Sequence, residues 1–302
     1  MKKISLVVLF FATLLTLAAC NTGQSNDKFT VVTTTTYIGD MVRQVGGNKV
    51  HVETLMEPGV DPHDYQPRQS DTDRINDADF IVVNGLNLEE KMVDVLQQVA
   101  SERILVLGDH VAEENLLYEE DGVIDPHIWF DIDIWKSLVS VLADRLGDID
   151  PDNATFYETR ANEYIKDLDM LDVYIRNRVE ELPEEARILV TAHDAFAYFG
   201  NAYGFEVHAV QGISTESEAS IADIENLAQL LVDKDVNRVF WETSVPQSTV
   251  DALVEAAQAL NHDVSVGGEL YSDSTGGYAS GHETYIRTYR ANIDIIIDAL
   301  TE

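Results

Sequence analysis

The tripeptide Asp-Pro-His occurs twice in this chain, at 61–63 and at 125–127. Imidazole binds zinc and the later first-row transition metals well, and a carboxylate adds affinity for harder ions such as manganese. The proline before each histidine restricts the loop backbone, so the imidazole is partly positioned before an ion arrives. The repeated motif therefore indicates that the chain delivers histidines, one at a time, to a shared metal ion.

The chain has eight histidines, and none is spaced as in the HExxH motif of zinc hydrolases. Position relative to the expected strands and helices is the better guide, and it selects His63, His127, His193 and Asp273 as metal ligands. The first two lie in the first half of the chain and the other two in the second half. We expect all four to meet in a cleft between the halves.

Acidic residues near these candidates are expected to support them. Asp64, Asp125 and Asp194 are candidates to accept the second ring N–H of a histidine and so to fix its orientation. Glu242 is the last residue of an expected strand. We expect it to support or pack beside the ligands rather than to bind the ion itself.

The elements that must position these residues alternate between strands and helices. In the first half, strands are expected at 29–35, 50–56, 80–84 and 103–107, and helices at 38–45, 69–77, 88–99 and 131–146. In the second half, strands are expected at 187–191, 205–211, 238–242 and 264–267, and helices at 194–203, 220–233, 248–260 and 283–300. This alternation predicts parallel sheets covered by helices, with the ligands in loops at the strand ends.

Between the halves, 151–182 has helical spacing and contains proline only at its first residue. A helix of this length spans about 45 Å, which suits a rigid bar between two lobes, although it could also pack within one domain. The expected fold is therefore α/β, with two lobes of parallel-type sheets joined by one long helix. We expect the domains to be 28–150, a linking helix at 151–183, and 184–302.

The N-terminal segment is typical of an exported protein. Two lysines precede an apolar run that ends in Leu-Ala-Ala-Cys, as in a bacterial lipobox, which predicts a signal peptide at 1–19 and lipid on Cys20. Residues 20–27 would then be a tether. Cys20 is the single cysteine, so no intramolecular disulfide is possible. The alternative is a secreted protein without an anchor.

The chain is strongly acidic, with a formal net charge of −34 from 54 acidic and 20 basic residues. Such a surface repels nucleic acids and anionic membranes, which excludes DNA and RNA as partners. The acidity is also typical of a host adapted to high salt or high pH, so by itself it says little about function.

The sequence resembles the bacterial zinc/manganese ABC-transporter solute-binding lipoproteins along nearly its whole mature length. The resemblance rests on VVTTTTYIGDMVRQVGG, LMEPGVDPHDYQP, DPHIWFD, VTAHDAFAYFGNAYGF, GISTESEAS and GGELYSDS. It implies one ion between two α/β lobes, bound by His63, His127, His193 and Asp273. It also implies a monomeric, non-enzymatic receptor on the outer face of the cell membrane, which passes its ion to a permease powered by a cytoplasmic ATPase.

The same resemblance bears on the metal. Zinc-specialised members carry a long His- and Asp-rich loop before the second ligand, whereas 108–125 is short here and contains one histidine, His110. This favours manganese. Some manganese members place glutamate at the third ligand, where this chain has His193, so zinc is the alternative. A secreted zinc metallohydrolase and an adhesin with a structural ion are the rival functions. Protons compete for imidazoles, so affinity is expected to fall below about pH 6.

Overall fold

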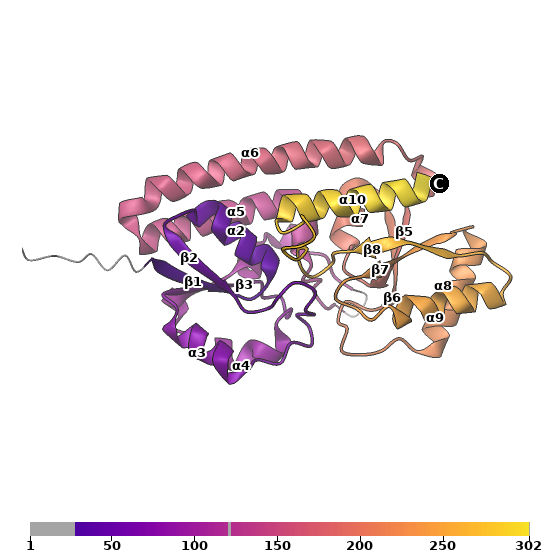
Figure 1. The fold of residues 1–302 in the computed structure, drawn as a ribbon, viewed down its shortest axis with the longest axis horizontal. Helices are drawn as coiled ribbons and strands as arrows, with labels where there is room; N and C mark the ends of the chain where they lie inside the picture. Colours follow the sequence, from indigo (N-terminus) through magenta and orange to yellow (C-terminus); the bar gives the residue numbers. More distant parts are fainter. Residues whose placement is uncertain (1–27, 120–121, 302) are drawn as a thin grey trace, which may run out of the picture.

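The computed structural model describes residues 28–119 and 122–301. The expected signal peptide at 1–19, Cys20 and the tether at 20–27 lie outside the described residues. The chain forms two α/β lobes side by side, with long helices along one side of the molecule (Figure 1). The expected fold class is therefore confirmed, with parallel strands in both lobes and one long helix.

The first lobe contains a four-stranded parallel sheet with the strand order β2-β1-β3-β4. Its strands are β1 (Phe29–Thr33), β2 (Val50–Thr54), β3 (Phe80–Val83) and β4 (Ile104–Val106), and its helices are α2 (Thr36–Gly46), α3 (Gln69–Asp77) and the single turn α4 (Val93–Leu96). In the central strand, Val31 pairs with Val52 on one side and Phe80 on the other, and it is fully buried. Continuous apolar strands are expected in a parallel sheet covered on both faces.

Two expectations for this lobe are corrected. The first strand ends at Thr33 because the side chain of Thr35 accepts a hydrogen bond from the backbone N–H of Ile38 (3.4 Å) and so begins α2. The prediction of a helix at 88–99 is wrong, because this segment contains only a 3₁₀ turn (Glu90–Met92) followed by α4. Met92 is nevertheless buried against the sheet, so the apolar spacing reports packing without a continuous helix.

Two packed helices follow the strands of the first lobe. They are α5 (Ile132–Ile149) and α6 (Ala154–Val179), and α6 lies along both lobes (Figure 1). The linking segment begins as a 3₁₀ turn at Pro151–Asn153, and its 26-residue helix spans about 39 Å. Among the described residues, no helix combines the length and the apolar character needed to cross a membrane.

The second lobe is built from two pairs of parallel strands. β5 (Ile188–His193) pairs with β6 (Glu206–Gln211), β7 (Arg238–Glu242) pairs with β8 (Ser265–Leu270), and β5 contacts β7. The helices are α7 (Ala197–Tyr203), α8 (Ile221–Asp233), α9 (Ser248–Ala259) and α10 (Tyr285–Thr301). The strands expected at 187–191 and 264–267 are therefore too short. His193 pairs with Gln211 and is the last residue of β5, two residues beyond the expected end of this strand.

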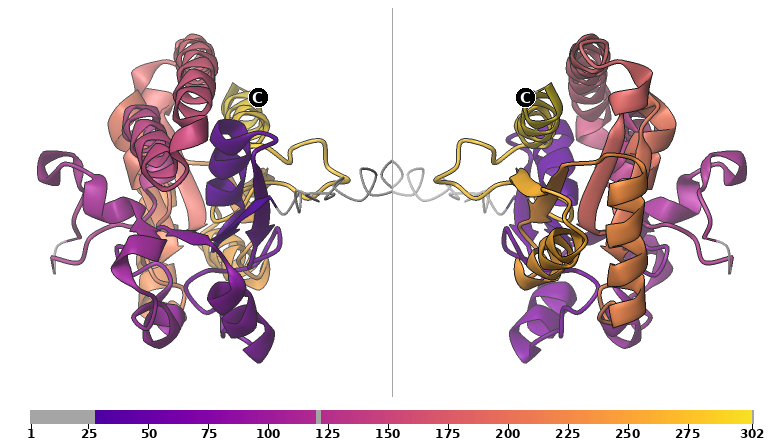
Figure 2. Two further views of the ribbon diagram at one scale, coloured as in Figure 1. Left: turned by 90° about the vertical axis from the view of Figure 1, so that its left-hand side faces the viewer. Right: turned by 90° about the vertical axis from the view of Figure 1, so that its right-hand side faces the viewer.

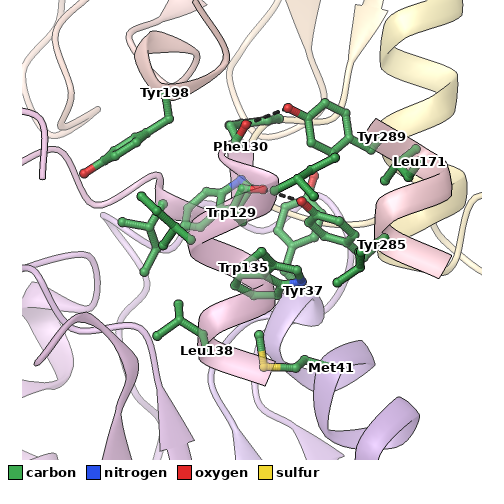
Figure 3. Packing of buried hydrophobic residues seen from close by; sticks show 14 of the residues in the cluster. Tyr37, Met41, Trp129, Phe130, Trp135, Leu138, Leu171, Tyr198, Tyr285 and Tyr289 are labelled. Atoms are coloured by element: carbon green, nitrogen blue, oxygen red, sulfur yellow. Dashed lines mark hydrogen bonds between the residues drawn. The ribbon is translucent and has the colours of Figure 1, made fainter. Parts of the chain in front are cut away.

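One hydrophobic core joins the two lobes. In the end views, α5, α6 and α10 are seen nearly end-on on the same side of the molecule (Figure 2). Aromatic residues of α10 pack onto the first lobe and also bond to it (Figure 3). The hydroxyl of Tyr285 donates to the carbonyl of Trp129 (2.6 Å), and that of Tyr289 donates to the carbonyl of Phe130 (2.6 Å). The C-terminal helix thus fixes the segment that follows His127.

Candidate metal centre

The four predicted ligands meet at one buried point. His63, His127, His193 and Asp273 each offer one ligand atom, and these atoms all lie within 4.8 Å of one another. Nε2 of His127 lies 3.3 Å from Nε2 of His63 and 3.4 Å from Nε2 of His193. Oδ1 of Asp273 lies 3.5 Å from Nε2 of both His127 and His193. All four side chains are buried.

The fold brings these residues together from four places. His63 lies in the loop between β2 and α3, and His127 directly precedes a 3₁₀ turn at Ile128–Phe130. His193 ends β5, and Asp273 lies three residues after the end of β8. Each lobe thus contributes two ligands from its loops or strand ends, as α/β folds do when they bind a ligand.

The structure explains why Asp-Pro-His occurs twice. In each copy the aspartate side chain accepts the backbone N–H of the histidine two residues later, from His63 to Asp61 and from His127 to Asp125 (both 2.9 Å). This is a local turn in which an aspartate takes the place of a backbone acceptor. Asp61 was not predicted to have a role, although the spacing of the motif itself carried the signal.

Carboxylates also hold two of the three imidazole rings. Nδ1 of His127 lies 2.7 Å from Oδ1 of Asp125, and Nδ1 of His193 lies 2.6 Å from Oε2 of Glu242. Glu242 also accepts the backbone N–H of His193 (2.8 Å). Contacts of this kind fix the tautomer and leave Nε2 free to bind an ion.

The expectations for the two other acidic neighbours are not met. Asp64 is exposed, with its carboxylate 3.8 Å from Nζ of Lys91. Within the described part of the chain, neither Asp64 nor Asp194 forms a hydrogen bond or ion pair with a ligand ring, and the ring of His63 has no carboxylate partner. The contact of His63 with a carboxylate hydrogen-bond acceptor is therefore made by its backbone, to Asp61.

Asp273 presents one oxygen to its protein neighbours and the other to the site. Its Oδ2 accepts hydrogen bonds from the hydroxyls of Ser244 (2.5 Å) and Ser272 (3.3 Å). Its Oδ1 is buried and accepts no hydrogen bond. A buried carboxylate oxygen without a donor is unfavourable unless a cation neutralises it. The donor set therefore fits a bound cation.

The spacing of the donors also fits one ion. An ion with tetrahedral bonds of about 2.1 Å separates neighbouring ligand atoms by about 3.4 Å. Four of the six separations between donor atoms are 3.3, 3.4, 3.5 and 3.5 Å, and all six are within 4.8 Å. Three neutral imidazoles and one carboxylate around a divalent ion would leave one net positive charge.

Burial and neighbouring charges set the protonation of the donors. Burial lowers the pKa of His63 to about 3, so its ring is neutral at neutral pH. Burial opposes the charged form of His127 as well, but Asp125 and Asp273 outweigh it and raise the pKa to about 9. Glu242 and Asp273 likewise raise the pKa of His193 well above its usual value, against burial. Despite burial, His193 and His127 hold the pKa of Asp273 well below its usual range.

A cleft of about 730 Å³ opens onto one side of the site. His63 borders this cleft, whereas the other three ligands do not line it. The lining is largely polar and includes Glu90, Glu119 and Asp194. An acidic cleft with one ligand in its lining offers a cation a route to the buried donors.

The fold and the site together define a two-lobed α/β protein with a buried cluster of four side chains between its lobes that could hold one metal ion. The chain belongs to the family described as zinc-uptake complex component A, periplasmic, whose model matches residues 31–299. Members of this family are the solute-binding components of ABC metal importers rather than enzymes. They act outside the cytoplasm with a permease and an ATPase.

Individual relatives cover nearly the whole chain. The manganese-binding lipoprotein MntA of Bacillus subtilis is 39% identical over 99% of this chain and 100% of its own length. The zinc-binding protein TroA of Treponema pallidum is 40% identical over 91% of this chain and 90% of its own, and its solved structure superposes with a TM-score of 0.88 over 90% and 99% of the two chains. The Fe(III)-bound YtgA of Chlamydia trachomatis is 26% identical, with a TM-score of 0.83 over 90% and 98%.

Proposed function

We propose that this protein captures one divalent transition-metal ion, with manganese favoured, through His63, His127, His193 and Asp273, and delivers it to the permease of an ABC importer. The observation that carries the proposal is the convergence of four buried donor atoms, two from each lobe, within 4.8 Å of one another. Four protein donors fill a tetrahedral site, whereas a catalytic zinc keeps one position open for water. The arrangement therefore supports a protein that binds an ion and does not use it for catalysis.

Substitution of single ligands tests the assignment. Asp273→Ala and His63→Ala should each abolish stoichiometric metal binding, because each removes one of four donors. His51→Ala is a matched control, because His51 is exposed and lies outside the site. The measurement is calorimetric titration of the purified protein together with metal content after gel filtration. Parent-like binding by both ligand variants would refute the ligand set.

The identity of the ion is a separate proposal. The short segment at 108–125 and the 39% identity to a manganese-binding lipoprotein favour manganese. The three imidazoles and the 40% identity to a zinc-binding protein support zinc as the second candidate. A site of nitrogen and oxygen donors binds zinc more tightly than manganese, so selectivity for manganese would have to come from the geometry of the site and the supply of each metal. Elemental analysis of protein purified from its own host, followed by competitive titration with both ions, separates the two.

We also propose that the receptor is a monomer, anchored by lipid on Cys20 after removal of 1–19 and tethered by 20–27. Its domains would be 28–150, the linking helix 151–183, and 184–302. More than one acyl chain is needed for firm retention in a membrane. Mass spectrometry of the N-terminal peptide should find acylated Cys20, and Cys20→Ala should release the protein from the membrane. Sedimentation of the detergent-solubilised protein tests the monomer.

A further inference from the structure

Asp61 contacts both lobes at once. Its Oδ1 accepts the backbone N–H of His63 in the first lobe (2.9 Å). Its Oδ2 accepts the hydroxyl of Thr215, which lies in the second lobe between β6 and α8. A single carboxylate therefore ties the backbone of a proposed ligand to a loop of the opposite lobe.

A second contact joins the same regions. Nζ of Lys91, in the first lobe, pairs with Oε1 of Glu216, the residue after Thr215, and lies 3.8 Å from Oδ1 of Asp64. Both side chains of the Lys91–Glu216 pair are about one-third exposed, so this ion pair alone is weak. It nevertheless shows that the loop at 212–219 meets the first lobe at more than one point beside the cleft.

His63 differs from the other two histidines in how it is held. The rings of His127 and His193 are fixed by Asp125 and Glu242, and neither ring borders the cleft. His63 borders the cleft, and the hydrogen bond to Asp61 is the contact that holds its backbone. The placement of His63 thus depends on Asp61 and, through Asp61, on Thr215.

We infer that Asp61 is a positioning residue that couples closure of the loop at 212–219 to the placement of His63, and so sets the rate at which the bound ion leaves. The inference rests on the proposed function, in which His63 is a metal ligand. When Thr215 releases Asp61, the carboxylate and the turn that it stabilises lose their fixed position. His63 is then free to withdraw, and the ion is exposed to the cleft.

The test removes the hydroxyl of Thr215 and leaves every proposed ligand in place. Thr215→Val lacks the donor at similar volume, and Thr215→Ser restores it. Thr159→Val is the control, because the hydroxyl of Thr159 bonds only within α6, to the carbonyl of Thr155 (2.7 Å). Each purified full chain is loaded with Zn²⁺ and mixed with excess colorimetric chelator in a stopped-flow instrument. Association rates and the unfolding midpoint of the metal-free protein are measured in parallel.

Thr215→Val should raise the dissociation rate about tenfold, the expected size for loss of one hydrogen bond to a charged group. Its association rate and metal-free midpoint should match those of Thr159→Val, and Thr215→Ser should release zinc at the parent rate. Release from Thr215→Val at the rate of the control would overturn the inference and leave the proposed function intact. A lowered midpoint with unchanged release would also overturn it, since the hydroxyl would then be merely structural. If the unsubstituted protein bound neither zinc nor manganese, the proposed function would be refuted as well.

Discussion

At the scale of single residues, the site is built from paired carboxylates and imidazoles. The backbone N–H of each histidine is bonded to an acidic side chain, from Asp61, Asp125 or Glu242. This arrangement fixes the loops before an ion arrives, so little ordering is required on binding. Besides the ligand Asp273, the acidic residues that matter for affinity are therefore these three rather than the many acidic residues of the surface.

Glu242→Gln should weaken metal binding about 10- to 100-fold, the usual effect of losing a carboxylate that orients a metal-binding histidine. The amide cannot accept from both the backbone N–H and the ring of His193. Isothermal titration gives the affinity, and Glu269→Gln serves as the control because Glu269 is exposed. Equal affinities for the two variants would show that Glu242 does not support the site.

The apparent metal affinity should fall as the pH decreases from about 9. The pKa of His127 is raised to about 9, so below that pH an incoming ion must displace a proton from its ring. The pH below which the metal affinity falls is therefore higher than the value near pH 6 that is expected for ordinary imidazoles. Titration at pH 7 in buffers of different ionisation enthalpy should detect released protons. An affinity that stays constant between pH 6 and pH 9 would contradict this prediction.

The four candidate ligands could be predicted from position, because loops at the ends of parallel strands converge whatever their spacing in the chain. Their partners were harder to predict. Asp64 and Asp194 are directly next to a histidine in sequence, whereas Asp125 is two residues away, yet of the three only Asp125 contacts a ring. The turn at each motif decides which aspartate points toward the ring of the histidine, and the periodicity of the sequence does not predict the form of that turn.

At the scale of elements, apolar spacing predicted nearly every strand and helix, with small errors at the ends. The segment 88–99 was the exception. Its apolar residues pack on the sheet as predicted, but they do so from turns, and Leu86 and Asn87 just before them adopt positive φ angles of 53° and 67°. The spacing of apolar residues indicates which side chains are buried. It does not determine the path of the backbone, on which the hydrogen bonds of a helix depend.

Leu171→Ala should lower the free energy of unfolding by about 2–5 kcal/mol, because Leu171 of α6 is fully buried in the shared core. Met170→Ala is a matched control, since the neighbouring side chain is 59% exposed. Its effect should stay within about 0.5 kcal/mol. Urea unfolding of the metal-free protein measures both, and similar losses for the two variants would contradict the packing described for α6.

At the scale of the whole molecule, α6 and α10 limit how far the lobes can separate. Both helices are packed along the lobes, and hydroxyls of α10 bond to backbone carbonyls next to the site. We therefore expect ion release to involve loop movement with little change in overall shape. X-ray scattering should give nearly the same radius of gyration with and without metal. An expansion typical of a wide hinge opening would show that the helices do not restrain the lobes.

The hydrophobic core that passes through both lobes has a consequence for folding. Side chains as far apart in the chain as Val31, Leu171 and Ile297 belong to the same set of buried contacts, so neither half can complete its interior alone. Heating should therefore melt the protein as one cooperative unit, with a single calorimetric endotherm, and a fragment limited to 184–302 should fail to fold. An ion bound where the halves meet would then protect every part of the chain from denaturation, and not merely the loops that touch it.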